Sequence, residues 1–348
     1  MKRIFTTLIV LTALTALTAA QETKYKVTTV AFYNLENLFD TINDPDIYLN
    51  EEFTPEGDKN YNTQKYESKL ENLSSVIEKV GADLTKQPPV VCGISEIENK
   101  SVVEDLVNET CLEKYNYGIV HYDSPDERGV DVGMIYRKDF FEVTASASYP
   151  VKFDFDTTDN TRDQLLVSGK LDGEQMHFIV VHWPSRGGGE MASRPKRNAA
   201  GDVARHIVDS LLKEDENAKI MVMGDFNDNP TDESLQDHLS AKGKKRSLKN
   251  DDLFNPMAEL YKDGVGSGAY RDKWYLFDMV IVSQGLLDDP KEGYSFYKAH
   301  IYNEPFLRQS KGRFKGYPYR SFVGDTWMGG YSDHFPAYIY LIKAVENE

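Results

Sequence analysis

Short apolar runs bounded by glycine or polar residues recur along the chain and predict buried strands. Such runs occupy 26–33, 90–94, 131–136, 220–223 and 337–342. Two further runs, 165–170 and 175–181, flank Asp172-Gly173, a dipeptide that favours the type I′ turn of a hairpin. An antiparallel pair is therefore expected there. A polar, proline-containing stretch after Asn37 predicts a long loop up to about Tyr61.

Segments whose apolar residues repeat with helical spacing lie between these predicted strands. Apolar residues spaced three and four positions apart predict an amphipathic helix on Tyr66, Leu70, Leu73, Ile77 and Val80. A second predicted helix spans 194–212, with one face formed by Ala200, Val203, Ile207 and Leu211. Ser101 and Glu104 form a capping-box pattern, which predicts that a third helix begins there. Hairpins mixed with helical crossovers favour a layered α/β sandwich over a purely parallel sheet.

The first twenty residues have the pattern of a secretory signal peptide. Lys2 and Arg3 precede an apolar stretch, and small residues end it at Ala20. The alternative is a membrane anchor, but the stretch is shorter than the roughly 20 apolar residues of a spanning helix and is diluted by threonines. We therefore expect cleavage near Ala20-Gln21, a secreted or periplasmic protein with no stable membrane anchor, and a single monomeric domain over 21–348.

Composition narrows the range of substrates. A hydrophobic content of 40% in 348 residues is ample for a core. Without Lys2 and Arg3, 38 basic residues face 56 acidic ones, a formal charge of −18. Such a surface repels polyanions, which argues against tight binding of duplex nucleic acid and favours a small ester or a substrate gripped locally. A metal ion can offset the negative charge of a carboxylate-rich site, so a nuclease stays open.

The two cysteines leave two alternatives open. Cys92 and Cys111 could pair in an oxidising compartment, or Cys92, which lies in an apolar strand pattern, could simply be buried.

Polar residues able to do chemistry recur where the predicted strands meet loops. Asp333 and His334 lie just before the strand 337–342, and the other members of the set follow or precede strands: Asn34, Glu96, His182, Asp225, Asn227 and Asp278. Scattered surface acids have no reason to prefer strand ends, whereas a site built from several strands needs its ligands there. The pattern predicts one shared site.

The chemistry of this set favours phosphoester hydrolysis assisted by a hard metal ion. Carboxylate and amide oxygens without a thiolate select Mg²⁺ or Mn²⁺. Asp225 can orient and deprotonate a water, and Asn227 can donate a hydrogen bond to the developing oxyanion. The two histidines, His182 and His334, can hold or protonate phosphate oxygens. Asp278 is the candidate that fixes the tautomer of His334.

These residues resemble the motifs of the endonuclease/exonuclease/phosphatase superfamily, which shares the deoxyribonuclease I-like fold. The most diagnostic matches are Gly224-Asp225-Phe226-Asn227 and Ser332-Asp333-His334. The other matches are Phe32-Tyr33-Asn34, Ile94-Ser95-Glu96, Val181-His182-Trp183 and Phe277-Asp278-Met279-Val280. Ser95 and Met279 depart from the residues that the family more often has at those positions.

The resemblance implies a four-layer sandwich of two facing, mainly antiparallel sheets with helices outside. It implies a divalent metal near Glu96, supported by Asn34 and Asp333, and in-line attack of water on phosphorus. Arg162 resembles an arginine that contacts substrate phosphate, and Arg128 and Arg186 are further candidates for that contact. Glu98 competes with Glu96 as the metal ligand, and Asn34 could instead only brace Glu96.

Three functions follow from these features. The expected function is a secreted phosphodiesterase acting as a nuclease. The alternative is a phosphatase or phosphodiesterase for inositol phosphates or phospholipid head groups. A third hypothesis, a catalytically silent binding protein of the same fold, fits less well because every expected ligand is retained. Substrate identity is a property of loops, which the fold does not determine.

Overall fold

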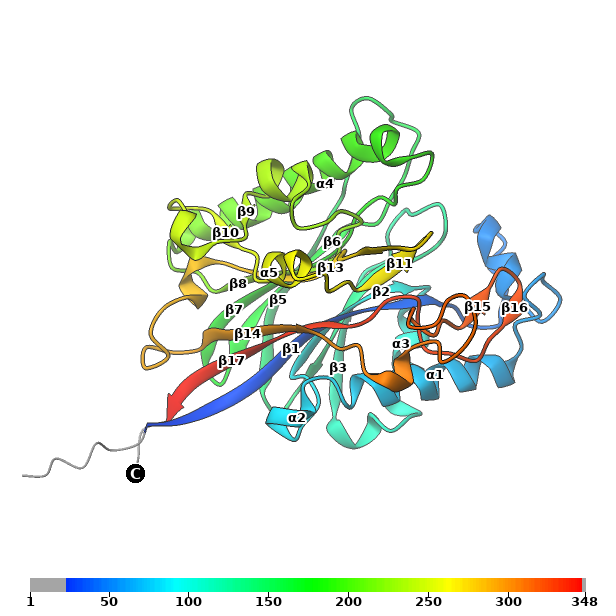
Figure 1. Cartoon of the computed structure of the whole chain (residues 1–348), viewed down its shortest axis with the longest axis horizontal. Coiled ribbons are helices and arrows are strands. Elements are labelled where there is room, and N and C mark those ends of the chain that lie inside the picture. Colours follow the sequence, from blue (N-terminus) through cyan, green and yellow to red (C-terminus); the bar gives the residue numbers. More distant parts are fainter. Residues whose placement is uncertain (1–22, 346–348) are drawn as a thin grey trace, which may run out of the picture.

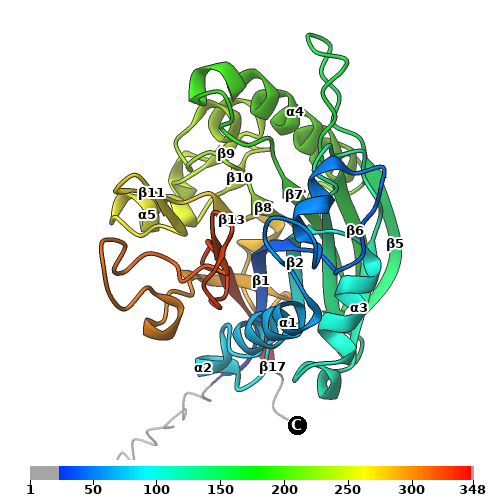
Figure 2. The same ribbon diagram turned by 90° about the vertical axis from the view of Figure 1, so that its right-hand side faces the viewer.

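Two β-sheets face each other in the middle of the molecule, and helices cover their outer faces (Figure 1). The computed structural model describes residues 23–345. Helices α1, α2 and α3 lie on one side of the sandwich and α4 on the other (Figures 1 and 2). This architecture confirms the predicted four-layer α/β sandwich. The predicted signal peptide, residues 1–20, lies outside the described residues.

The first sheet has six strands and contains both ends of the described chain. Its spatial order is β14 (Ser295–Ile301), β17 (Ala337–Val345), β1 (Lys24–Leu38), β2 (Val91–Ile97), β4 (Asp131–Arg137) and β3 (Tyr117–His121). Only β1 and β2 run parallel in it, with Phe32 opposite Gly93. All other neighbours are antiparallel.

The second sheet has seven strands. Its order is β5 (Phe141–Tyr149), β6 (Gln164–Leu171), β7 (Glu174–His182), β8 (Ile220–Asp225), β13 (Asp278–Val282), β10 (Leu253–Phe254) and β9 (Ala241–Lys242). The hairpin predicted between β6 and β7 is confirmed, because Asp172 and Gly173 have φ angles of 49° and 83°, as a type I′ turn requires. β7 and β8 are parallel and pair His182 with Asp225.

The remaining elements are short, apart from three of the five helices. The helices are α1 (Thr63–Ile77), α2 (Ala82–Thr85), α3 (Lys100–Asn108), α4 (Glu190–Glu214) and α5 (Met257–Lys262). Two small hairpins complete the fold, β11 (Gly268–Tyr270) with β12 (Lys273–Tyr275), and β15 (Phe322–Val323) with β16 (Thr326–Trp327). Among the described residues, none of the helices combines the length and the apolar character needed to span a bilayer.

Two helix starts differ from the prediction. The cap of α3 is Asn99, whose side chain accepts a hydrogen bond from the Val102 amide, so the capping box at Ser101 and Glu104 was wrong. Asn99 is as good a cap as serine, and the helix therefore begins two residues earlier than predicted. α4 begins at Glu190 rather than 194, directly after Gly189, and it contains Pro195.

The predicted loop up to Tyr61 is largely confirmed, except that a 3₁₀ turn spans Tyr48–Phe53. Cys92 and Cys111 do not form a disulfide in this structure. Cys92 is buried, which was the alternative to a disulfide.

Two glycines allow the strands that carry the site to lie close together. A Cβ on Gly93 of β2 would lie 2.8 Å from Sδ of Met223, which belongs to the opposite sheet. A Cβ on Gly224 of β8 would lie 2.0 Å from the carbonyl oxygen of Val181 on β7. The glycine before Asp225 is therefore required by the backbone of the neighbouring strand.

We predict that Gly224→Ala destabilises the protein by about 1–3 kcal/mol, because the overpacked methyl group must push β7 and β8 apart. Urea unfolding measures this loss. The matched control is Gly187→Ala, because a Cβ there has only the Ser185 hydroxyl within 4 Å, at 3.5 Å. Equal stability of the two variants would contradict the close approach of the two strands.

Candidate active site

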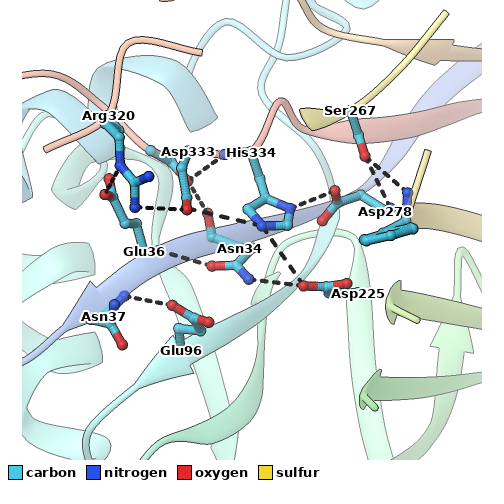
Figure 3. A network of polar contacts seen from close by, with 12 residues as sticks. Asn34, Glu36, Asn37, Glu96, Asp225, Ser267, Asp278, Arg320, Asp333 and His334 are labelled. Carbon is cyan, nitrogen blue, oxygen red and sulfur yellow. Dashed lines mark hydrogen bonds and ion pairs between the residues drawn. The ribbon is translucent and has the colours of Figure 1, made fainter. Parts of the chain in front are cut away.

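Strand ends from both sheets meet at one end of the sandwich and bring the predicted site residues together (Figure 3). β1 and β2 supply Asn34 and Glu96 from the first sheet. The second sheet supplies His182, Asp225 and Asp278 from β7, β8 and β13. His334 lies on the segment that leads into β17.

Asp225 is the centre of this arrangement. Its Oδ1 accepts a hydrogen bond from the Asn227 amide at 2.9 Å, and its Oδ2 accepts one from Nδ2 of Asn34 at 3.2 Å. Nε2 of His182 and Nε2 of His334 lie 3.7 and 3.8 Å from the same Oδ2. The carboxylate is 2% exposed. A single buried oxygen thus faces two imidazoles.

His334 is oriented by Asp278, as predicted. Its Nδ1 lies 2.7 Å from Oδ2 of Asp278, a buried carboxylate. Ser267 accepts hydrogen bonds from the backbone amides of Phe277 and Asp278, which fixes the start of β13 (Figure 3). A carboxylate on Nδ1 leaves Nε2 free to point toward Asp225 and the space beside it.

The surroundings set different charge states for the two histidines. Burial alone would lower the pKa of His334, but the negative charges of Asp278 and Asp225 raise it well above its usual value. Burial, with Arg162 and Arg128 nearby, lowers the pKa of His182 well below its usual value. At neutral pH His334 is therefore a cation and His182 is neutral. Burial also raises the pKa of Asp225 to about 7, opposed by His334 and reinforced by Asp278.

Glu96 and Glu98 were both candidates for the metal ligand, and their carboxylates lie in different surroundings. Glu96 has a φ of 58° at an irregularity in β2, and its Oε2 accepts a hydrogen bond from the Asn37 amide at 3.0 Å. Its Oε1 lies 3.9 Å from Nε2 of His182. Glu98 instead accepts hydrogen bonds from the Asp40 amide and the Asn50 side chain. Strict alternation would have put both acids on one face; the irregular backbone separates them.

The side chains of Asn34 and Asn227 form hydrogen bonds with other groups of the protein. Oδ1 of Asn34 accepts a hydrogen bond from the Glu36 amide at 2.9 Å, while its Nδ2 donates to Asp225. Asn227, at a φ of 51°, donates from Nδ2 to the Trp183 carbonyl at 2.9 Å. Asn34 therefore holds Asp225, and not Glu96 as the bracing alternative had it. Trp183 is 1% exposed and belongs to the core.

A polar network that the sequence reasoning missed supports Asp333. Nη2 of Arg320 donates to Asp333 at 3.0 Å, and its Nε donates to Glu36 at 3.1 Å (Figure 3). Lys69, which is 1% exposed, donates to the Glu36 carbonyl and to Ser321. Arg320 lay in a cationic segment of the sequence. Lys69 lies three residues after Tyr66 and four before Leu73, at the edge of the apolar face of α1, a position that could have signalled its burial.

The three arginines predicted for substrate contact are all engaged with protein groups. Arg128 donates to Asn37 and lies 3.4 Å from Glu96. Arg186 donates to the Asn227 carbonyl and pairs with Asp228 and Asp232. Both are partly exposed.

Arg162 does not fit the predicted contact with substrate phosphate. It is 6% exposed, and its three guanidinium nitrogens donate to the carbonyls of His182 and Trp183 and to Asp126. Its donors are occupied by the backbone that follows β7, so in this structure Arg162 positions His182 instead of facing the substrate.

The donor set suits a hard divalent cation. Single ligand atoms of Asp225, Asp278 and His334 lie within 4.8 Å of one another, and Glu96 lies beside them through His182. Carboxylate and amide oxygens predominate, as Mg²⁺ and Mn²⁺ prefer. A second group, His121, Asp123 and Asp131, lies on β3 and β4 and the loop between them. The residues present therefore fit a divalent cation. The sequence predicted it at Glu96 with Asn34 and Asp333, whereas the ligand atoms that face one another belong to Asp225, Asp278 and His334.

A family model described as "Endonuclease/Exonuclease/phosphatase family" matches residues 29–343. No curated protein matches the chain in sequence.

Solved structures of the same fold are numerous. One is an endonuclease/exonuclease/phosphatase family protein from Bacteroides thetaiotaomicron, with 14% identity over 94% of this chain and 98% of that chain and a TM-score of 0.55. Another is a mannosyl-6-phosphatase from the same organism, with 15% identity, 90% and 99% coverage and a TM-score of 0.53. A third is D. rerio TDP2 complexed with a single-strand DNA product, with 13% identity, 90% and 98% coverage and a TM-score of 0.53. At these identities the likeness shows the fold.

We predict that Arg162→Met costs about 3–5 kcal/mol of stability, because it leaves Asp126 buried without its ion pair. Urea unfolding gives the loss. The control is Arg194→Met, which removes a solvent-exposed helical pair with Glu190 and should leave the stability almost unchanged. An unchanged stability together with a raised KM would restore the role of substrate contact.

Proposed function

The chain belongs to the endonuclease/exonuclease/phosphatase family, and on this premise we propose that it is a divalent-metal-dependent phosphodiesterase that cleaves nucleic acid. The observation that carries the proposal is the placement of one buried carboxylate oxygen of Asp225 between Nε2 of His182 and Nε2 of His334. A general base flanked by two imidazole groups suits in-line attack of water on a phosphate ester.

Each residue has a defined task in this proposal. Asp225 accepts the proton of the attacking water, and Asn34 and the Asn227 amide hold its carboxylate in place. His334, cationic and fixed by Asp278, donates a hydrogen bond from Nε2 to a non-bridging phosphate oxygen. His182 is neutral and donates from Nε2 on the opposite side, because that nitrogen faces Glu96 and Asp225.

Glu96 would hold the metal, with Asp333 on the far side of the site. A bound Mg²⁺ or Mn²⁺ supplies Lewis-acid stabilisation of the phosphate charge. The remaining acids then keep their partners, Asp278 on His334 and Glu36 on Arg320. Arg128 lies next to Glu96 and, being about one-third exposed, is placed to turn toward a phosphate oxygen.

The comparisons supply two substrate classes. TDP2 of D. rerio was solved with a single-strand DNA product, which supports a nuclease, and the B. thetaiotaomicron neighbour is a mannosyl-6-phosphatase, which supports a phosphatase. The second candidate is favoured by one observation: Arg128, Arg162, Arg186 and Arg320 are each paired with a carboxylate. Few free cations thus line the site itself, as for a small ester.

We also propose, on the sequence of residues 1–20 alone, that the protein acts outside the cytoplasm. The basic start, the apolar stretch and the small residues before Gln21 support this. A mature N-terminus at Gln21, found by mass spectrometry of protein from the producing cells, is the expected result.

The metal requirement is tested with bis-p-nitrophenyl phosphate and oligonucleotides in Mg²⁺, Mn²⁺ or EDTA. EDTA should abolish hydrolysis, and Asp225→Asn should lower kcat about 10²–10⁴-fold, since it removes the general base. The control is Asp58→Asn, which changes an exposed carboxylate outside both candidate metal groups and should be neutral. Activity that persists in EDTA would defeat the metal mechanism, and activity on sugar phosphates alone would favour the second candidate.

Asp278→Asn should lower kcat about 10²-fold or more with KM nearly unchanged, because the amide no longer stabilises the imidazolium of His334. Steady-state kinetics on bis-p-nitrophenyl phosphate separate the two constants. The control variant is Ser267→Ala, which removes the hydrogen-bond acceptor of the Asp278 amide. It should lower the stability of the protein. A parallel rise of KM in Asp278→Asn would mean that the dyad only holds the substrate.

A further inference from the structure

A basic cleft lies outside the active site, in a chain whose formal charge is −16. It encloses about 930 Å³, and its rim carries Lys242, Lys244, Lys245, Arg246 and Lys262. Four of these cations fall within five consecutive residues. Glu259 is the one carboxylate among the lining residues. This dense cluster of positive charge contrasts with the net negative charge of the protein.

The cations of this cleft differ from those of the active site in being unpaired. Within residues 23–345 none of the five forms an ion pair, whereas Arg128, Arg162, Arg186 and Arg320 all do. Lys244, Lys245 and Arg246 are exposed. Unpaired cations that converge on a cavity leave their charge available to an anionic ligand.

The walls hold the cations in place without neutralising them. Nζ of Lys242 donates to the Gln236 carbonyl. Nζ of Lys245 lies 5.3 Å from the ring centroids of both Phe254 and Phe296. A cation over two aromatic faces keeps its full charge, and its stem is ordered by the contact. Phe254 is 8% exposed, so the floor of the cleft is apolar and firmly packed.

The cleft is joined to the active site through one loop. Pro230 and Thr231 line it, and the same loop begins at Asp225. Five residues of extended chain reach at most about 17 Å, so the near edge of the cleft lies within about 17 Å of Asp225. That is the rise of about five stacked nucleotides. Nε2 of Gln236 donates to the carbonyls of Pro230 and Ala241 and so ties this edge to the strand of Lys242. Lys242 lies level with Met221, four residues before Asp225 on β8, so the cations are farther from Asp225 than this edge is.

We infer that this cleft is an exosite that binds the phosphate backbone of a single nucleic-acid strand whose scissile phosphate lies at Asp225. The inference rests on the proposed function and specifies its substrate. A strand neutralised by several lysines gains affinity through counterion release. A small ester cannot span both places. A single strand suits a concave cleft better than the wider duplex does.

The test compares the charge-reversed variant Lys244→Glu/Lys245→Glu/Arg246→Glu with wild type. On a twenty-residue oligothymidylate the variant should lose at least tenfold in kcat/KM, and on bis-p-nitrophenyl phosphate it should stay within twofold of wild type. A three-residue oligothymidylate should behave like the small ester. The slope of log kcat/KM against log salt should fall by about 2, for three lost contacts to a single strand.

The matched control carries the same change of charge elsewhere, as Lys138→Glu/Lys213→Glu/Lys298→Glu. These three lysines are also exposed, and none of them lines the cleft. If the control loses as much activity on the long oligonucleotide as the cleft variant, net charge explains the effect and the exosite is refuted. The milder Lys244→Ala/Arg246→Ala variant repeats the comparison without adding acids and guards against misfolding of the triple variant.

Binding in EDTA keeps this test separate from the proposed function. Fluorescence anisotropy of a labelled oligothymidylate should show the same loss of affinity in the cleft variant, whether or not the wild type turns over. If wild type fails to hydrolyse any phosphodiester, the proposed function fails while the binding result still decides the exosite. Cleft-dependent binding of anionic phospholipid vesicles or of duplex DNA in preference to the single strand would overturn the inference.

Discussion

The hydrogen bond between Asn34 and Asp225 is the contact on which the site depends, because it joins the two sheets. Asn34 belongs to β1 in the first sheet and Asp225 ends β8 in the second. Both side chains are buried, so the bond is shielded from competing water. His334, from the segment that leads into β17 of the first sheet, and His182, from the second sheet, meet at the same oxygen. The relative position of the sheets therefore sets the catalytic geometry.

Much of this arrangement follows from the sequence, because strand ends are easy to recognise. Apolar runs located the strands that carry Asn34, His182 and Asp225, and the pairing of Asp278 with His334 was predicted and found. Contacts between residues far apart in the chain could not be predicted from the sequence. The buried Lys69 bonds to Ser321, 252 positions away, and no local pattern announces such a partner. The Asn99 cap was missed because Ser101 offered an equally good local signal.

Backbone conformation explains the errors at the site itself. Alternation along β2 could not separate Glu96 from Glu98, but a φ of 58° at Glu96 turns its carboxylate toward His182. A non-glycine residue in the left-handed region is uncommon and costs free energy, and such strain concentrates at functional sites. Arg162 was misassigned for another reason: a motif gives the residue type, whereas only the fold shows that its guanidinium already serves two backbone carbonyls and Asp126.

The net charge of the chain says little about one patch of its surface, because electrostatic interactions in salt solution are local. At physiological ionic strength the screening length is about 8 Å, so acids on the far surface hardly act on the cleft at Lys244. Whether a cation can attract an anionic ligand depends instead on whether a nearby carboxylate already pairs with it. The active-site arginines are neutralised by Asp126, Asp228 and Asp333, while the cleft holds a single acid, Glu259, against five cations. The chain as a whole carries a net negative charge, yet this cleft presents a local cluster of positive charge to an anionic ligand.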